Sequence, residues 1–193
     1  MKFKTREIIL VPLFSALTII GAFMKIPIGF VPITLQYLFT ALSGVLLGPI
    51  LGAMSQLIYV ILGLIGLPVF TSGGGLSYIL TPTFGYLLGF IVAPYIIGKI
   101  VYNAKPSFSR ILIASILGLL VTYLIGTTYM YIILNYVTNI KITLLKSVEV
   151  GILVFIPGDF IKCVITAELG SKIIPKLNKS YKKDGIKKSY KKI

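Results

Sequence analysis

Long apolar stretches recur along this chain, and they restrict its fold more than any other feature. They predict six helices, over Ile8–Met24, Ile33–Leu47, Ile50–Ile65, Thr83–Gly98, Ile111–Leu134 and Val148–Ile174. About 20 apolar residues in a helix span the hydrocarbon core of a bilayer. Charged residues make up 12% of the chain and its mean hydropathy is +0.98, whereas about a quarter of a soluble domain is charged. We therefore expect an all-α membrane protein with six transmembrane helices in one domain, residues 1–174.

The net charge of +14 follows a membrane pattern. Nine of the 19 basic residues lie between Lys172 and Lys192, three precede the first predicted helix, and three lie between Lys99 and Arg110. Such clustering in alternate loops indicates the cytoplasmic side of a membrane, so we expect contact with lipid, both termini in the cytoplasm and no nucleic-acid partner. Residues 175–193 are rich in lysine and poor in apolar residues, which predicts a disordered tail on the anionic inner leaflet.

The residue types exclude several kinds of chemistry. The chain has no His and a single Cys, Cys163, which argues against a structural zinc site or a His-based catalytic centre. No phosphate-binding glycine motif is present for a nucleotide. We therefore expect no metal, no cofactor and no enzymatic reaction in this chain.

One acid is not explained by its local setting. Of the five acids, Glu7 and Asp184 lie in the predicted cytoplasmic flanks, Glu149 begins a helix, and Glu168 can pair with Lys172. Asp159 lies deep in the last apolar stretch, three residues before Lys162, so both side chains can share one helix face. Each charge costs about 2.5–3.5 kcal/mol near the bilayer centre. Either the pair only neutralises itself, or it binds a ligand that presents N–H and C=O groups side by side.

Two connections carry unusual sequences. Residues Lys25–Pro32 contain two prolines, which predicts an extended crossing on the outer side. The uncharged segment Gly66–Pro82 is rich in glycine, yet it also contains Phe70 and Tyr78. A water-exposed connector does not need such apolar side chains, so we expect a lid packed on the helices. Tyr123, like the tyrosines around it, is interpreted as a packing or membrane-interface residue.

Five motifs stand in a fixed order along the chain: Pro32-Ile33-Thr34-Leu35-Gln36; Leu47-Gly48-Pro49-x-Leu51-Gly52; Gly63-x-x-Gly66-Leu67-Pro68-Val69-Phe70 with Gly73-Gly74-Gly75; Pro82-Thr83-x-Gly85-Tyr86-Leu87-Leu88-Gly89-Phe90; and Pro157-Gly158-Asp159-x-x-Lys162. This order resembles the BioY family, the biotin-specific substrate-binding (S) components of energy-coupling factor (ECF) transporters, over about Ile8–Ile174. The resemblance implies an S-component fold in a prokaryotic plasma membrane, with biotin captured near the outer face beneath the glycine-rich loop. It also implies a transmembrane coupling (T) protein and two cytoplasmic ATPases as partners.

The resemblance also implies site residues. Asp159 and Lys162 match the acid and the lysine of the family's binding site, and their chemistry suits the ureido group of biotin. Weaker candidates for the pocket are Gln36, Gly74, Gly75, Ser77 and Tyr86. Gln36 can equally serve a helix–helix hydrogen bond, and Tyr86 can simply pack.

The first helix departs from the family pattern. Family members carry small residues four apart on this helix, at the face that docks on the T protein. The corresponding positions here are Pro12 and Ala16. Proline lacks an N–H group and can bend the start of the helix, so docking at Pro12 and Ala16 is a weaker expectation.

Three rival functions stay open at this point. The chain can be an S component for a different small vitamin, a ligand-free membrane scaffold, or a membrane enzyme. The lack of His and the single buried acid argue against the enzyme. The ordered motifs and the Asp159–Lys162 face favour biotin over the other two.

Overall fold

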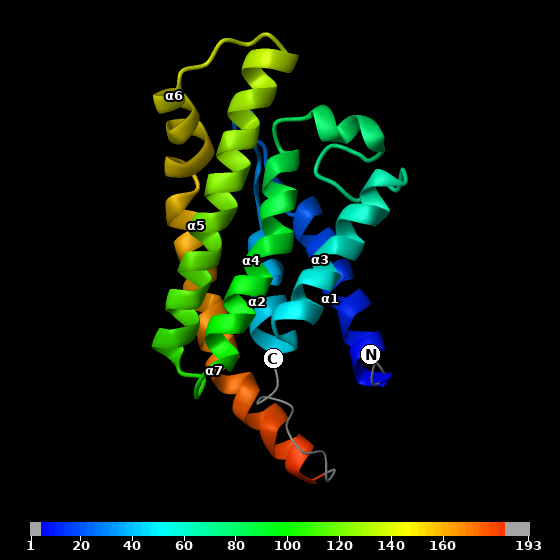
Figure 1. The fold of residues 1–193 in the computed structure, drawn as a ribbon, viewed down its shortest axis with the longest axis vertical. Coiled ribbons are helices and arrows are strands. Elements are labelled where there is room, and N and C mark those ends of the chain that lie inside the picture. The colour runs from blue at the N-terminus through cyan, green and yellow to red at the C-terminus, as the bar shows by residue number, and fades with distance from the viewer. Residues whose placement is uncertain (1–4, 184–193) are drawn as a thin grey trace.

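A computed structural model describes residues 5–183 of the chain, which form a long helical bundle (Figure 1). Its helices are α1 (Thr5–Phe23), α2 (Gln36–Leu47), α3 (Pro49–Leu64), α4 (Phe84–Tyr102), α5 (Phe108–Ile132), α6 (Leu144–Val148) and α7 (Ile156–Lys183). A 3-10 turn η1 (Leu76–Leu80), two π-helical turns η2 (Ile133–Val137) and η3 (Glu149–Leu153), and strands β1 (Lys25–Ile26) and β2 (Ile33–Thr34) complete the described elements. The predicted all-α class is confirmed, with one short hairpin added to it.

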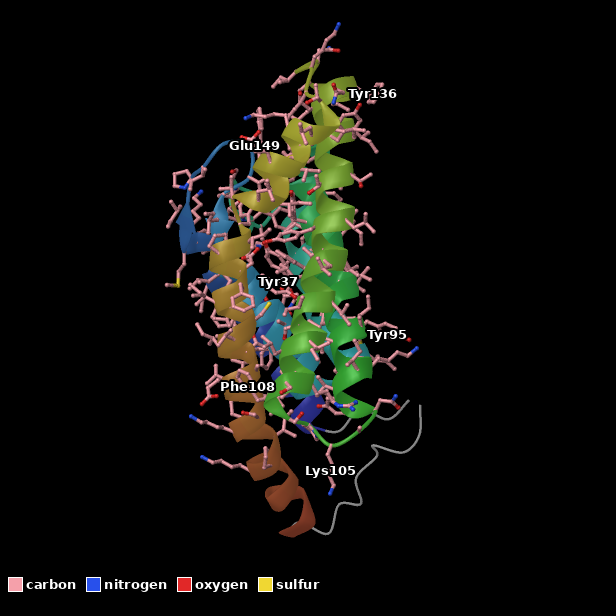
Figure 2. The ribbon with its side chains drawn as sticks, turned by 90° about the vertical axis from the view of Figure 1, so that its left-hand side faces the viewer. Tyr37, Tyr95, Lys105, Phe108, Tyr136 and Glu149 are labelled. Atoms are coloured by element: carbon pink, nitrogen blue, oxygen red, sulfur yellow. The ribbon has the colours of Figure 1, made fainter. Side chains whose placement is uncertain are left out.

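Different segments of the chain lie at the two ends of the bundle. The start of α1, the α4–α5 connection and the end of α7 lie at one end (Figure 1). Lys105 and Phe108 mark this end in the side view, whereas Tyr136 and Glu149 lie at the opposite one (Figure 2). Both described chain ends therefore lie on one side of the bundle. Their cytoplasmic orientation stays a prediction.

Length and composition identify the spans that can cross a membrane. Among the described residues these are Phe84–Tyr102 and Phe108–Val137, with a third if the bent pair Leu144–Leu153 and Ile156–Lys176 counts as one. Shorter apolar helices cover Ile8–Phe23, Gln36–Leu47 and Pro49–Leu64. The chain is thus a helical membrane protein, and the number of six spans stays a prediction.

Helix α5 shows how such a bundle sorts its side chains. Three of its leucines, Leu117, Leu120 and Leu124, point outward and are 41%, 55% and 69% exposed. Beside the larger Ile111, Leu119, Tyr123 and Met130, the inward face carries small and polar residues: Ala114, Ser115, Gly118, Thr122, Gly126 and Thr127. Lipid solvates leucine as well as a protein core does, so a membrane bundle places small residues where helices meet. On this face Gly126 contacts α4 so closely that an added Cβ would lie 2.4 Å from the Tyr86 ring.

The predicted reversal between the second and third helices is confirmed. Gly48 ends α2 with φ at +89°, a conformation that favours glycine. Pro49 then occupies the first turn of α3, where a missing N–H costs nothing. The start of the second helix is a correction. Ile33 and Thr34 pair with Ile26 and Lys25 as a hairpin, so α2 begins only at Gln36.

The last predicted helix, Val148–Ile174, needs the largest correction. Helix begins earlier, at Leu144, and passes through the π turn η3 before it breaks at Val154 and Phe155. The segments on either side of the break meet at an angle of 41°. At the other end, α7 runs past the predicted end at Ile174 and continues to Lys183; the disordered tail stays a prediction. Residues 184–193 of the predicted tail lie outside the described residues.

Candidate functional site

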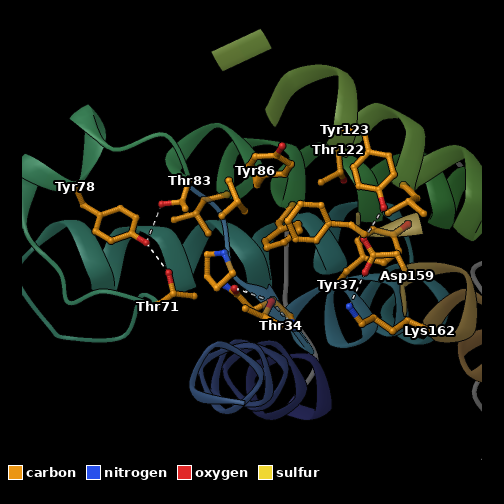
Figure 3. Close-up of a pocket in the computed structure, with 17 residues that line it drawn as sticks. Thr34, Tyr37, Thr71, Tyr78, Thr83, Tyr86, Thr122, Tyr123, Asp159 and Lys162 are labelled. Carbon is orange, nitrogen blue, oxygen red and sulfur yellow. Dashed lines mark hydrogen bonds and ion pairs between the residues drawn. The ribbon is translucent and has the colours of Figure 1, made fainter. Parts of the chain in front are cut away.

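A cavity lies among α2, α4, α5, α7, the hairpin and the glycine-rich loop. Its lining is Val31, Pro32, Thr34, Gln36, Tyr37, Thr71, Tyr78, Thr83, Tyr86, Leu87, Phe90, Leu119, Thr122, Tyr123, Phe155, Asp159 and Lys162. Apolar and aromatic side chains form most of the wall. Polar groups gather at its two ends, and Thr34 forms a further hydrogen-bonded pair with Gln36 between them (Figure 3).

The charged end of the cavity holds Asp159 and Lys162, each only 6% exposed. The Lys162 ammonium donates to Asp159 Oδ1 at 2.5 Å, and the Tyr123 hydroxyl donates to Asp159 Oδ2 at 2.7 Å. Figure 3 shows the three groups meeting at one side of the cavity. Buried charges are stable only when they are paired and hydrogen-bonded, and this arrangement meets both conditions.

This cluster keeps unused hydrogen-bonding capacity. Among the described residues, the Lys162 ammonium donates to Asp159 alone, so its other N–H groups are available. Each Asp159 oxygen accepts one hydrogen bond, and a carboxylate oxygen has a further lone pair for another. The cluster can therefore accept from ligand N–H groups and donate to a ligand carbonyl at the same time.

The opposite end of the cavity is polar but carries no charged side chain in its lining. The Thr83 hydroxyl donates to the Tyr78 hydroxyl at 3.0 Å, and the Thr71 hydroxyl lies 2.9 Å from the same oxygen. Tyr78 and Thr71 are 4% and 8% exposed. We call Thr71, Tyr78 and Thr83 the hydroxyl cluster.

Two of the weaker sequence candidates line the cavity. Gln36 is buried, and its amide nitrogen donates to the Tyr59 hydroxyl at 2.8 Å. It therefore joins α2 to α3 as well as lining the site. Tyr86 presents its ring to the cavity, while its hydroxyl donates to the carbonyl of Gly151 at 2.8 Å. The geometry is thus compatible with pocket lining and a helix–helix hydrogen bond for Gln36, and with pocket lining and packing for Tyr86.

Gly74, Gly75 and Ser77 lie outside the cavity lining. An added Cβ on Gly74 would lie 2.1 Å from the carbonyl oxygen of Leu67, and the Gly75 N–H donates to the Gly63 carbonyl at 2.7 Å. The two glycines thus let the loop fold back on the end of α3. Ser77 is exposed. Ligand contact by these three residues stays a prediction.

The expectation of a packed loop is confirmed for its aromatic residues. Phe70 is 1% exposed and sits edge-on to Tyr59, with ring centroids 5.5 Å apart. The Tyr78 ring centroid lies 4.5 Å from that of Phe70. In contrast, Leu76 and Leu80 are 70% and 56% exposed, so the loop packs mainly through its aromatic rings, with Val69 and Ile79 partly buried against the core.

The expected docking residues Pro12 and Ala16 lie on one outward face of α1. Both are exposed, along with Leu13 and Ile20. This face is free to meet either lipid or a partner helix. Docking through Pro12 and Ala16 therefore stays a prediction.

Sequence reasoning interprets Tyr123 as a packing or membrane-interface residue and does not place it in the site. Its ring is buried, with 4% exposure, and its hydroxyl binds Asp159, so it is no interface residue. Leu119 and Thr122 line the cavity beside it. The sequence contained a signal that could have identified these residues, because they recur at the three- and four-residue spacing of one helix face. That face of α5 turns inward. Tyr37, whose hydroxyl donates to the carbonyl of Ser115 at 2.5 Å, gave no such signal.

Comparisons with known proteins agree with this geometry. The BioY family model matches residues 1–179. The chain is 41% identical to a probable biotin transporter BioY of Lysinibacillus sphaericus, covering 88% of this chain and 87% of that one. It is 38% identical to the biotin transporter BioY of Thermotoga maritima, over 84% and 92% of the two chains.

A solved structure gives the same fold. The crystal structure of an S-component for biotin from an ECF-type ABC transporter superposes with a TM-score of 0.76 at 31% identity, covering 89% of this chain and 94% of that one. The sequence, the cavity and these matches lead to one conclusion: the chain belongs to the BioY family.

Proposed function

We propose that this chain binds biotin and serves as the S component of an ECF-type uptake transporter. The observation that carries the proposal is the Tyr123–Asp159–Lys162 cluster at one end of an apolar cavity. Biotin presents a ureido group, with N–H and C=O groups side by side, on an apolar bicyclic ring. Asp159 accepts from the ureido N–H groups, and Lys162 donates to its carbonyl oxygen.

Uptake needs partners in addition to this chain. We propose a T protein and two cytoplasmic ATPases, with both termini of this chain in the cytoplasm of a prokaryote. The family resemblance supports these partners, and the grouping of basic residues supports the orientation. The chain itself performs no catalysis and uses no cofactor in this proposal, because the ATPases supply the energy.

Biotin titration of the purified protein by calorimetry tests the function. We expect saturable binding, and a loss of at least about tenfold in affinity for Asp159→Asn and for Lys162→Ala, because hydrogen bonds to charged groups contribute about 1.5–3 kcal/mol. Glu149→Gln is the matched control, since Glu149 forms an i,i+3 pair with Lys146 that lies far more exposed. If both site variants bind biotin like the wild type, the assigned site is wrong.

Competition and stability measurements separate the rival functions. Desthiobiotin keeps the ureido group and should displace biotin, whereas thiamine and riboflavin should not. Displacement by either of those two favours an S component for another vitamin. Biotin at a hundred times its Kd should add about 2.7 kcal/mol to the free energy of unfolding. An unchanged stability favours the scaffold, and chemical conversion of bound biotin favours the enzyme.

A further inference from the structure

The hydroxyl cluster is a second polar region of the cavity, away from the charged end. Thr71 and Tyr78 come from the glycine-rich loop, and Thr83 directly precedes α4. Figure 3 shows the three hydroxyl groups gathered at one side and the Asp159–Lys162 pair at the other, with Tyr86 and Tyr37 between them. A ligand that fills the cavity therefore meets polar groups at both of its ends.

The hydroxyl cluster has a hydrogen-bond donor to spare. Each hydroxyl carries one proton that it can donate. Thr83 uses its proton on Tyr78, and a single proton joins Tyr78 to Thr71. The other proton of the Tyr78–Thr71 pair has no acceptor among the described residues. Because both residues are buried at the cavity wall, that donor suits an acceptor on the ligand.

The charges decide which ligand group belongs at each end. A carboxylate beside Asp159 would repel it across a poorly solvated gap, and Lys162 is already paired with that acid. At the hydroxyl cluster the nearest full charge is positive, because the Lys25 ammonium donates to the backbone carbonyl of Thr71. An anionic ligand group is therefore favoured at the hydroxyl cluster and disfavoured at the charged end.

We propose that the hydroxyl cluster, with Lys25 behind it, is a subsite that binds the carboxylate end of the ligand and selects free acids over neutral derivatives. This inference rests on the proposed function, because biotin carries its carboxylate at the far end of the chain from its ureido group. In this orientation the ureido group meets Asp159 and Lys162, and the apolar body of the ligand lies against Leu87 and Phe90.

Calorimetric titration with biotin and with its neutral amide tests the subsite, because the ratio of the two affinities cancels any general loss of binding. We expect the wild type to bind the acid roughly ten- to a hundredfold more tightly than the amide, as one hydrogen bond to a charged group would give. Tyr78→Phe should bring this ratio down by about tenfold and leave the affinity for the amide nearly unchanged.

Tyr129→Phe is the matched control. Its hydroxyl donates to the carbonyl of Ile79, so it also holds the glycine-rich loop, but Tyr129 does not line the cavity. The acid-to-amide ratio of this variant should equal that of the wild type. Lys25→Gln changes an exposed residue and provides a second test, in which the ratio should fall severalfold and depend less on salt.

The outcomes are distinct. Equal binding of acid and amide by the wild type overturns the subsite and leaves the proposed function standing, as does a ratio that stays unchanged in both Tyr78→Phe and Lys25→Gln. A ratio that falls equally in Tyr78→Phe and Tyr129→Phe also overturns it, since loop placement alone would then explain the effect. If the wild type binds neither compound, the proposed function itself fails.

Discussion

Removing the ammonium of Lys162 leaves the carboxylate of Asp159 buried, and among the described residues the Tyr123 hydroxyl is then its only partner. The substitution Lys162→Met keeps most of the side-chain volume and deletes the charge. Loss of one partner from a buried ion pair costs about 3–5 kcal/mol, because the remaining charge is left uncompensated. Water that enters the cavity can solvate Asp159 in part, so we expect a loss of about 3 kcal/mol in the free energy of unfolding.

The double variant Asp159→Asn/Lys162→Met should recover most of that loss. Asparagine can still accept from Tyr123 through its amide oxygen, and no charge remains to be desolvated. Replacement of a whole buried pair by uncharged groups is commonly neutral, so we expect a stability within about 1 kcal/mol of the wild type. The double variant should nevertheless lose biotin binding, which would separate the folding role of the pair from its ligand role.

Reversible unfolding in mixed detergent micelles, without biotin, measures these differences. The control is Lys146→Met, which breaks an ion pair of the same i,i+3 spacing whose side chains are 54% and 53% exposed. Exposed pairs contribute about 0–1 kcal/mol, so this variant should stay close to the wild type. The four stabilities at positions 159 and 162 form a double-mutant cycle and give the coupling energy directly.

Two results would refute this reasoning. If Lys162→Met is no less stable than Lys146→Met, the pair at the cavity is not desolvated as its burial indicates. If the double variant is as unstable as the sum of the two single changes, the two charges do not stabilise one another.

Two further predictions concern neighbouring groups. Tyr123→Phe removes one hydrogen bond from the buried carboxylate and should weaken biotin binding by roughly tenfold in calorimetry, whereas Tyr131→Phe, on the same helix but outside the cavity lining, should not. Gly63→Ala would place a Cβ 2.0 Å from the Phe70 ring and should cost about 1–3 kcal/mol of unfolding free energy. Gly158→Ala, which meets nothing within 4 Å, should show no such loss; an equal loss in both glycine variants would contradict the packing argument.

The sequence predicted the helices well because long apolar stretches leave a membrane chain few alternatives. It located the reversal at Gly48 and the break before α4. It failed at the end of the extended crossing, where Ile33 and Thr34 join Lys25 and Ile26 in a hairpin rather than opening α2. It also placed the end of the last helix too early, at Ile174, whereas α7 continues to Lys183.

The site could be predicted only in part. Asp159 and Lys162 stood out because intramembrane charges are costly, and their i,i+3 spacing placed them on one face. The hydroxyl cluster could not be found this way, since threonine and tyrosine cost little at many depths and their meeting depends on how the glycine-rich loop folds. Tyr123 could be predicted as a site residue only if the inward face of α5 were known.

The break before α7 explains why its charged residues face the cavity. Pro157 cannot donate a backbone hydrogen bond, so it is best accommodated in the first turn of a helix, and α7 starts at Ile156. This start places Phe155, Asp159 and Lys162 at a spacing of four and three residues, which is one helix face, and all three line the cavity. The backbone reinforces the arrangement, because the N–H of Asp159 donates to the carbonyl of Phe155 at 2.9 Å. Pro157 therefore favours a helix start at this point, and hence the direction in which the charged pair points.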